Sequence, residues 1–299
     1  MEVYLICDES GAKGRDKVGE KEKGEVGVFA GCFVPDRKLS EFELWSQAAA
    51  SKYFKGNKTH ISGLPKSDQL SLEHEVFDLI KSRTIICAYE AIYAEGFKDG
   101  RLSEIQLYEN IEKLSPGLKN LYKKHKRPLS LHQILFTGLL DKAIAFLSDH
   151  CDPSNDELRI LVDRVDSGVL KLLERAIEDT LEMGKGLDTF ANPPICANHT
   201  ADGSNYPEEL GILKVLKTLR GKINIDQASD NLTLIPDIIA HSLYQHFMKF
   251  DDNEIGGLLN SPVGLVGHEL ANIFYGQSDL LDGMNWWTDA QYMYPRSEA

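Results

Sequence analysis

The sequence predicts an α/β fold built on a five-stranded mixed sheet flanked by helices. Two apolar segments come first, separated by the loop 12–24, which is rich in Gly and charge and has no periodicity, as is typical of a hairpin. The later apolar segments alternate with helical ones, which indicates strands joined by helical crossovers. The length of 299 residues suits one large domain with insertions or two small domains.

Five apolar segments are predicted to be strands. The first, VYLICD, is apolar on both faces and ends on an acid, and the fourth, LRILVD, has the same pattern. Apolar residues on both faces are typical of a central strand that is covered on both sides. The predicted strands are 3–8, 24–36, 83–95, 158–163 and 222–226.

Six longer segments are predicted to be helices, and the clearest is LSLHQILFTGLLDKAIAFLSD. We expect a core domain over 1–250 with a helical insertion at about 97–150. The remaining 251–299 are predicted to form an acidic, aromatic C-terminal extension that packs on the domain. The predicted helices are 39–54, 70–81, 129–149, 167–183, 207–221 and 232–250.

The composition excludes some classes of function. With 33 basic against 46 acidic residues, the net charge of −13 argues against a protein that coats nucleic acid with a basic surface, but a local basic patch remains open. The five cysteines form no CxxC pair, and no basic region followed by an apolar stretch opens the sequence. We therefore expect a cytoplasmic protein with reduced cysteines and no membrane segment.

Three aspartates occur where a ligand site is expected. Asp8 and Asp163 end predicted strands, and Asp237 lies near the start of the last predicted core helix. In an open α/β sheet, ligands gather outside the strand ends at a switch point. Neighbouring carboxylates repel one another unless a cation joins them, and Mg²⁺ and Mn²⁺ prefer oxygen ligands. Any one of these aspartates taken alone could instead be a turn or capping residue.

The start of the helix that carries Asp237 has two interpretations. If Thr233 is the N-cap, Pro236 falls in the first turn, where proline is tolerated, and Asp237 lies near the positive end of the helix dipole. If the helix starts at Ser229 or Asp230 instead, Pro236 should kink it.

Several short motifs together resemble a large prokaryotic family of unknown function that is assigned to the RNase H-like superfamily. The motifs are DESG, the strand GVFAGCFVPD, the loop KTHISGL, the segment ILVDR and the C-terminal INIDQASDNLTLIPDIIAHSLYQHF. The resemblance spans 1–250 and implies an RNase H-like sheet with helices on both faces. The family's Leu-Gln-x-Ala-Asp motif reads LTLIPD here, with Thr233 in place of Gln and Pro236 in place of Ala.

The resemblance also implies a site and an activity. Asp8, Asp163 and Asp237 take the positions of the family's divalent-metal carboxylates, and Glu9 is either a fourth ligand or a cap of the turn. Side-chain alternation along the strand turns Glu9 away from the face of Asp8. The implied activity is that of a metal-dependent nuclease, with Mg²⁺ or Mn²⁺ as cofactor and a setting in mobile elements or phage defence.

His60 and two basic segments are further candidates. His60 could orient a phosphate or carry a proton, or it could be an ordinary surface residue. The basic segments 119–127 and 214–222 could contact a nucleic-acid backbone or could simply be solvated helix faces. Their candidate residues are Lys119, Lys123, Lys124, Lys126, Arg127, Lys217 and Arg220.

Two functional hypotheses follow. The first is a nuclease that cleaves DNA or RNA with Asp8, Asp163 and Asp237 around the metal. The second is a catalytically degenerate RNase H-like domain that binds a partner or nucleic acid. The C-terminal aromatic residues are expected to pack on the domain, or else to form an oligomer or partner contact; they are Trp286, Trp287, Tyr292 and Tyr294.

Overall fold

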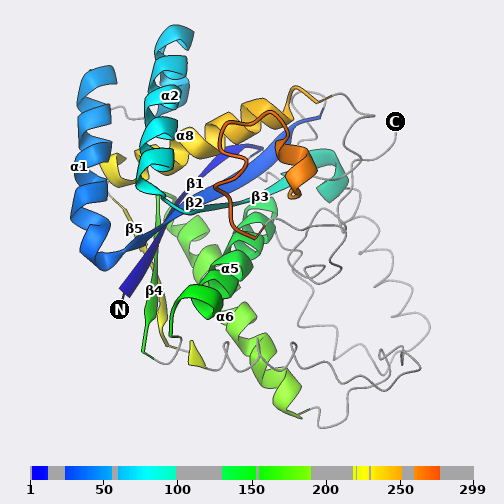
Figure 1. Ribbon diagram of the computed structural model, residues 1–299. Helices are drawn as coiled ribbons and strands as arrows, with labels where there is room; N and C mark the ends of the chain where they lie inside the picture. The colour runs from blue at the N-terminus through cyan, green and yellow to red at the C-terminus, as the bar shows by residue number, and fades with distance from the viewer. Residues whose placement is uncertain are drawn as a thin grey trace.

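The computed structural model contains one five-stranded mixed sheet (Figure 1). It describes residues 2–12, 24–55, 60–98, 130–152, 155–189, 218–219, 221–228, 230–250 and 259–276. The strand order is β3-β2-β1-β4-β5, with β2 antiparallel to β1 and β3, and with β4 parallel to β1 and β5. The prediction of an α/β fold with a five-stranded mixed sheet flanked by helices is thereby confirmed. The strands are β1 (Glu2–Gly11), β2 (Val26–Pro35), β3 (Cys87–Tyr93), β4 (Glu157–Val162) and β5 (Ile223–Gln227).

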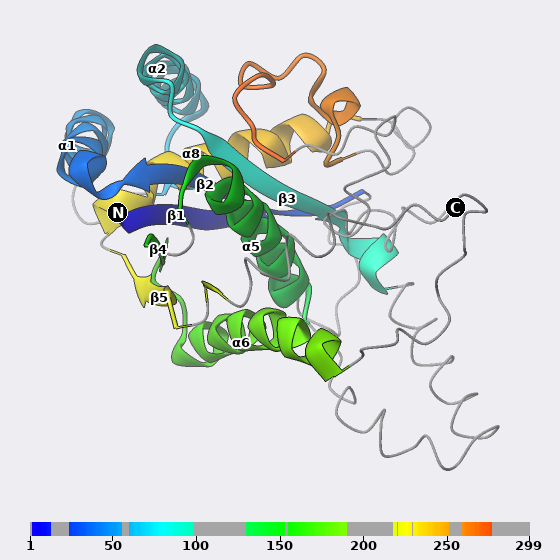
Figure 2. The ribbon, with the colours of Figure 1, turned by 60° about the horizontal axis from the view of Figure 1, so that its bottom comes forward.

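Helices cover both faces of the sheet, as Figure 2 shows with the sheet seen from another side. One face carries α1 (Asp36–Tyr53), α2 (Lys66–Arg83) and α8 (Asp230–Phe247), and the other carries α5 (Leu131–His150) and α6 (Ser167–Thr189). None of the described helices is long and apolar enough to cross a membrane.

Strand β1 lies at the centre and is buried on both faces, as its sequence predicts. Tyr4 and Ile6 join the core under α8, whereas Val3, Leu5 and Cys7 join the core under α5 and α6. This alternation decides which way each residue at the end of the strand points, because successive side chains lie on opposite faces.

The prediction that the fourth strand is apolar on both faces holds only toward its end, where Leu161 is half-buried against the core under α8. Leu158, Ile160 and Val162 of β4 are buried on one face, but Glu157 and Arg159 on the other face are exposed. Arg159 instead forms an ion pair with Glu2 of β1. The strand is therefore covered mainly on the side of α5 and α6.

The first strand does not end at Asp8 as predicted but runs on to Gly11. Its pairing with β4 stops at Cys7 and Val162, while its pairing with β2 continues to Gly11 and Gly27. From Asp8 onward, β1 therefore has β2 along one edge, and no strand of the described residues pairs along the edge where β4 has ended. Asp8 thus lies at the point where two parallel strands separate.

Helix α5 belongs to the segment that we predicted to be a helical insertion, and it packs directly on the sheet, within the core that contains Phe29 and Phe33 of β2. Its first turn is closed by a capping box, in which the Ser130 side chain accepts from the Gln133 backbone and the Gln133 side chain accepts from the Ser130 N–H. The rest of the predicted insertion, 99–129, lies outside the described residues.

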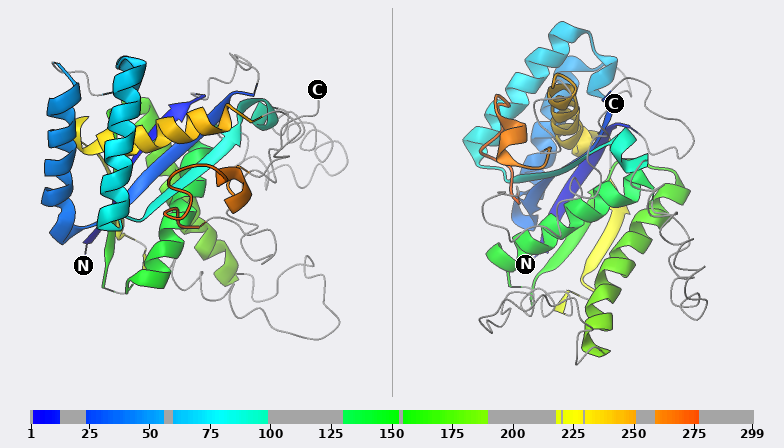
Figure 3. Two further views of the ribbon diagram at one scale, coloured as in Figure 1. Left: turned by 45° about the horizontal axis from the view of Figure 1, so that its top comes forward. Right: turned by 90° about the vertical axis from the view of Figure 1, so that its right-hand side faces the viewer.

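Residues 259–276 of the predicted extension pack beside β3 and α8 (Figure 3, orange). Phe274 forms a bridge with Cys87, and the Tyr89 hydroxyl donates to the Leu259 carbonyl at 2.7 Å. The next residue of β3 after Tyr89 is the fully buried Glu90, whose carboxylate accepts hydrogen bonds from Lys142 at 2.8 Å and from Asn260 at 2.9 Å. Segments 251–258 and 277–299 lie outside the described residues.

Gly11, the last residue of β1, lies against helix α8, and a substitution there tests how closely the helix packs on the strand. Its φ is +83°, and a Cβ there would lie 2.1 Å from the Val26 carbonyl oxygen and 2.6 Å from the Tyr244 ring. We expect Gly11→Ala to lower the free energy of unfolding by about 1–3 kcal/mol or more in chemical denaturation. The matched control is Gly221→Ala, because Gly221 also has a positive φ of +73° but open space around it. Equal losses in the two variants would contradict the close approach of α8 to the end of β1.

Candidate metal centre

Asp8 is a nearly buried carboxylate on the α8 side of the sheet, with 7% of its surface exposed. Its Oδ1 accepts the backbone N–H of Glu9 at 2.7 Å, and within the described part of the chain its carboxylate forms no ion pair. Burial raises the pKa of Asp8 well above its ordinary value, and the charges of Asp237 and Asp163 raise it further. The free energy of the site therefore favours either a proton or a cation at Asp8.

Asp163 follows the last residue of β4 and lies next to Asp8. The residue before it, Val162, pairs with Cys7, the residue before Asp8, so the parallel strands deliver both aspartates to the same edge. The Thr233 hydroxyl of α8 donates to Asp163 Oδ1 at 3.2 Å. Asp163 is thus held from the side by a buried hydroxyl group.

Of the two predicted starts of the helix that carries Asp237, the structure has the earlier one, before Thr233. Helix α8 begins at Asp230, so Thr233, Pro236 and Asp237 all lie inside it. Pro236 has no N–H for the carbonyl of Leu232, the residue four positions before it. Thr233 does not serve as the cap, because its hydroxyl is used on Asp163, and Asp237 lies beyond the first turn, where the helix dipole acts most strongly.

The Asp237 carboxylate holds the loop that carries His60. Asp237 Oδ2 accepts the backbone N–H of Ile61 at 2.8 Å, and it lies 3.8 Å from His60 Nδ1. Ile61 itself is fully buried in the core under α8. The backbone beside His60 is therefore fixed, although the imidazole is 60% exposed.

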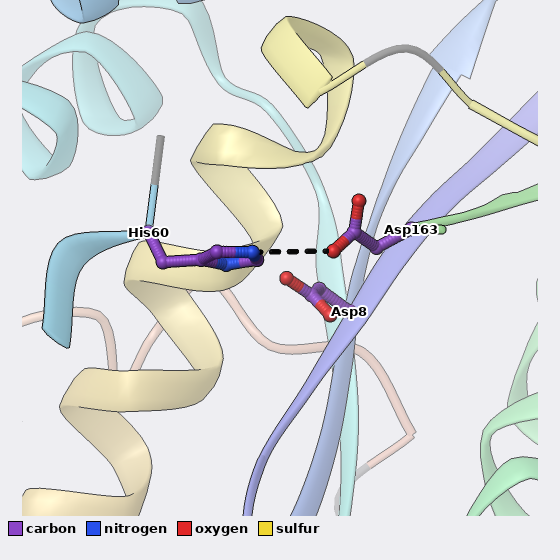
Figure 4. Close-up of side chains that lie close together, drawn as sticks. All are labelled: Asp8, His60 and Asp163. Carbon is purple, nitrogen blue, oxygen red and sulfur yellow. Dashed lines mark ion pairs between the residues drawn. The ribbon is translucent and has the colours of Figure 1, made fainter. Parts of the chain in front are cut away.

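His60 completes the cluster (Figure 4). Its Nε2 lies 3.7 Å from Asp163 Oδ2, and one ligand atom from each of Asp8, His60 and Asp163 can be chosen such that all three lie within 4.8 Å of one another. The carboxylate of Asp237, 3.8 Å from Nδ1, is the largest cause that raises the pKa of His60 to about 9, and the charges of Asp163 and Asp8 add to it.

The structure thus brings together four of the five proposed catalytic residues, namely Asp8, His60, Asp163 and Asp237. Glu9 lies on the opposite face, as side-chain alternation predicts, where it forms an ion pair with His132 of α5. The seven basic residues proposed to contact nucleic acid are outside the described residues.

His132 and His241 were missed by the sequence analysis, which considered Thr233 as a possible N-cap but missed its contact with Asp163. Thr233 precedes Asp237 by four residues and His241 follows it by four, a spacing that places all three on one face of a helix. Among the described residues, the buried His241 Nε2 has no hydrogen-bond partner. His132, which pairs with Glu9, lies in the first turn of a helix with no local motif to mark it. If the helix is taken to start before Thr233, the spacing of four residues places Thr233 and His241 on the same helix face as Asp237.

No protein-family model matches the chain, and no curated protein matches it. Among solved structures, it is similar to the crystal structure of Bst-RNase HIII in complex with Mn²⁺, at 10% sequence identity and a TM-score of 0.36. The match covers 98% of this chain and 65% of that one, so this chain spans less than two thirds of that protein's length.

The His60 loop gives a prediction for the metal-free protein. In a chelator, an NMR titration of the His60 ring should give a pKa of about 9, and Asp237→Asn should lower it, because the largest stabilising charge is removed. Since the pKa is raised in the folded state, this group contributes stability below about pH 6.5, which is lost as the pH rises through about 9. Asp78→Asn, on the exposed surface of α2, should leave the His60 titration unchanged. A His60 pKa at the ordinary value of 6.5 in the wild type would contradict this geometry.

Proposed function

We propose that this protein is a divalent-metal-dependent nuclease that hydrolyses phosphodiester bonds of DNA or RNA. The observation that supports this most directly is the position of Asp8. It is a nearly buried carboxylate that faces Asp163 where two parallel strands separate, and no described cation pairs with it. The strand-separation point of an α/β sheet is where ligands of such folds bind.

The residues at this point fit a hard divalent cation. Asp8, Asp163 and Asp237 offer only carboxylate oxygens, which Mg²⁺ and Mn²⁺ prefer. A divalent charge would offset the mutual repulsion that raises the pKa of Asp8. When bound, such an ion supplies a polarised water and stabilises the charge that develops on the phosphate oxygens.

The protein's own residues then have separate tasks. Asp8 and Asp163 hold the ion from the sheet, and Thr233 keeps the Asp163 carboxylate in one orientation. Asp237 adds negative charge and anchors the loop of His60 through Ile61. His60, exposed at the solvent side of the cluster, lies where it can either bind the ion or pass a proton to the substrate.

The rest of the proposal concerns partners and setting. Backbone phosphates of the substrate would be contacted by the basic segments 119–127 and 214–222. The sequence motifs favour a setting in mobile elements or phage defence, and the cysteine pattern favours the cytoplasm. A contact with an oligomer or protein partner would use the C-terminal extension.

One observation favours the second candidate, a degenerate domain that binds without catalysis. His60 lies within 4 Å of both Asp163 and Asp237, so a charged imidazole can offset the repulsion of these two carboxylates in the absence of metal. In that case the acidic cluster is satisfied by the protein itself, and metal would add nothing to its stability.

The deciding experiment is a nuclease assay on single- and double-stranded DNA and RNA with Mg²⁺ or Mn²⁺. Asp8→Asn and Asp163→Asn keep the shape of the side chain but remove a charged ligand, so each should lower cleavage by about a hundredfold or more. The exposed Asp78→Asn on α2 serves as the control and should retain full activity. Cleavage that is unchanged in Asp8→Asn would overturn the proposal.

Thermal unfolding of the same variants separates the two candidates. In a chelator, Asp8→Asn should be at least as stable as the wild type near pH 7, because burial penalises the charged form of Asp8. Addition of Mn²⁺ or Mg²⁺ should raise the Tm of the wild type but not that of Asp8→Asn. A wild type whose Tm and cleavage do not respond to either metal would support the degenerate domain.

A further inference from the structure

The three residues whose ligand atoms lie closest together are not the three aspartates. They are Asp8, Asp163 and His60, whose ligand atoms all lie within 4.8 Å of one another. Two atoms bound to one ion at about 2.1 Å each can be at most about 4.2 Å apart, so a small rotation of these side chains suffices to bind one ion. Figure 4 shows the imidazole approaching the two carboxylates from the opposite side of the site.

Asp8 supplies independent support for a ligand at this position. Its carboxylate is more than nine-tenths buried and points toward the space between Asp163 and His60 (Figure 4). Its one hydrogen bond comes from the neighbouring Glu9 N–H, and no described cation forms an ion pair with it. A buried charge that no ion pair compensates lowers the stability of the fold, and a bound cation would remove that cost.

His60, and not Asp237 or Glu9, belongs with Asp8 and Asp163 to the group of ligand atoms that lie within 4.8 Å of one another. Asp237 Oδ2 accepts the Ile61 N–H at 2.8 Å, and the Glu9 carboxylate pairs with His132 on the other face of the sheet. The same bond from Ile61, whose side chain is fully buried, fixes the backbone next to His60. The imidazole is therefore positioned by Asp237 although its own surface is largely exposed.

We infer that His60 binds the metal ion together with Asp8 and Asp163, and that this mixed nitrogen and oxygen site selects Mn²⁺ over Mg²⁺. The inference rests on the proposed function, since it concerns the same site. Mg²⁺ is a hard ion that takes oxygen ligands and keeps several waters, whereas Mn²⁺, although it also takes carboxylates, accepts an imidazole nitrogen more readily than Mg²⁺ does. Asp237 is then a positioning residue that holds the His60 loop, and His60 is a ligand rather than a proton carrier.

The test measures metal binding directly on the metal-free, full-length protein. Pulsed electron paramagnetic resonance of bound Mn²⁺ reports the ¹⁴N nuclei of a coordinated imidazole, and Mn²⁺ and Mg²⁺ titrations give the two affinities. The wild type should show the imidazole ¹⁴N signal and bind Mn²⁺ more tightly than Mg²⁺. His60→Gln should lose the signal and bind Mn²⁺ on the order of tenfold or more weakly, with a smaller change for Mg²⁺.

A matched control is available on α2. His74 also has carboxylates on both sides, with Nε2 3.9 Å from Asp78 and Nδ1 3.8 Å from Glu269, but this group is exposed and contains no buried acid. His74→Gln should keep both the ¹⁴N signal and the Mn²⁺ affinity. Circular dichroism of His60→Gln should match that of the wild type, because the side chain lies mostly in solvent.

The outcomes separate this inference from the proposed function. If Mn²⁺ binds the wild type without an imidazole ¹⁴N signal, and Asp8→Asn abolishes that binding, the metal site stands and the role of His60 is overturned. Equal affinities for Mn²⁺ and Mg²⁺ that His60→Gln leaves unchanged would also overturn it. If the wild type binds neither ion, or if Asp8→Asn binds as well as the wild type, the proposed function fails and the inference fails with it.

Discussion

The arrangement around the site depends on one electrostatic constraint, the buried carboxylate of Asp8. Burial alone raises its pKa, and two further carboxylates, Asp163 and Asp237, raise it again. A fold that only needed stability would place an apolar side chain there, because β1 is apolar on this face up to Ile6. The charge is instead kept where β4 ends and leaves an edge of β1 open.

Helix α8 connects the sheet to the loop on its other side. Thr233 donates to Asp163, and one turn later Asp237 accepts from Ile61, so a single helix face fixes both the strand end and the His60 loop. A shift of α8 along its axis would therefore displace the Asp163 contact and the His60 loop at once. Pro236 lies between these two contacts, and the helix tolerates the lost hydrogen bond because its buried residues, Leu234 to Ile239 among them, pack in the core.

The parts of this site that follow from local patterns were predictable from the sequence. Period-two alternation places Asp8 and Glu9 on opposite faces, and parallel strand ends bring Asp8 beside Asp163. The bond between Asp237 and Ile61 joins residues 176 positions apart, and no local rule specifies it. Nor could a local rule place Thr233, because proline at 236 favours a later helix start and so conceals the side chain's contact with Asp163. The buried ion pair of Glu90 and Lys142 could not be predicted for the same reason, because its two charges come from β3 and from the distant helix α5.

The two adjacent acids at the end of β1 have different physical tasks because a strand turns them to opposite sides. Beyond Cys7, β1 has lost its pairing with β4, and among the described strands β2 alone continues to pair with it. The pair formed by Glu9 and His132 ties this segment to α5 on one face, and the contact between Gly11 and Tyr244 of α8 limits it on the other. These contacts hold the backbone on either side of Asp8, whose side chain is 7% exposed and lies beside other carboxylates. Because the buried charge is unfavourable by itself, a cation bound beside it would lower the free energy of the folded protein.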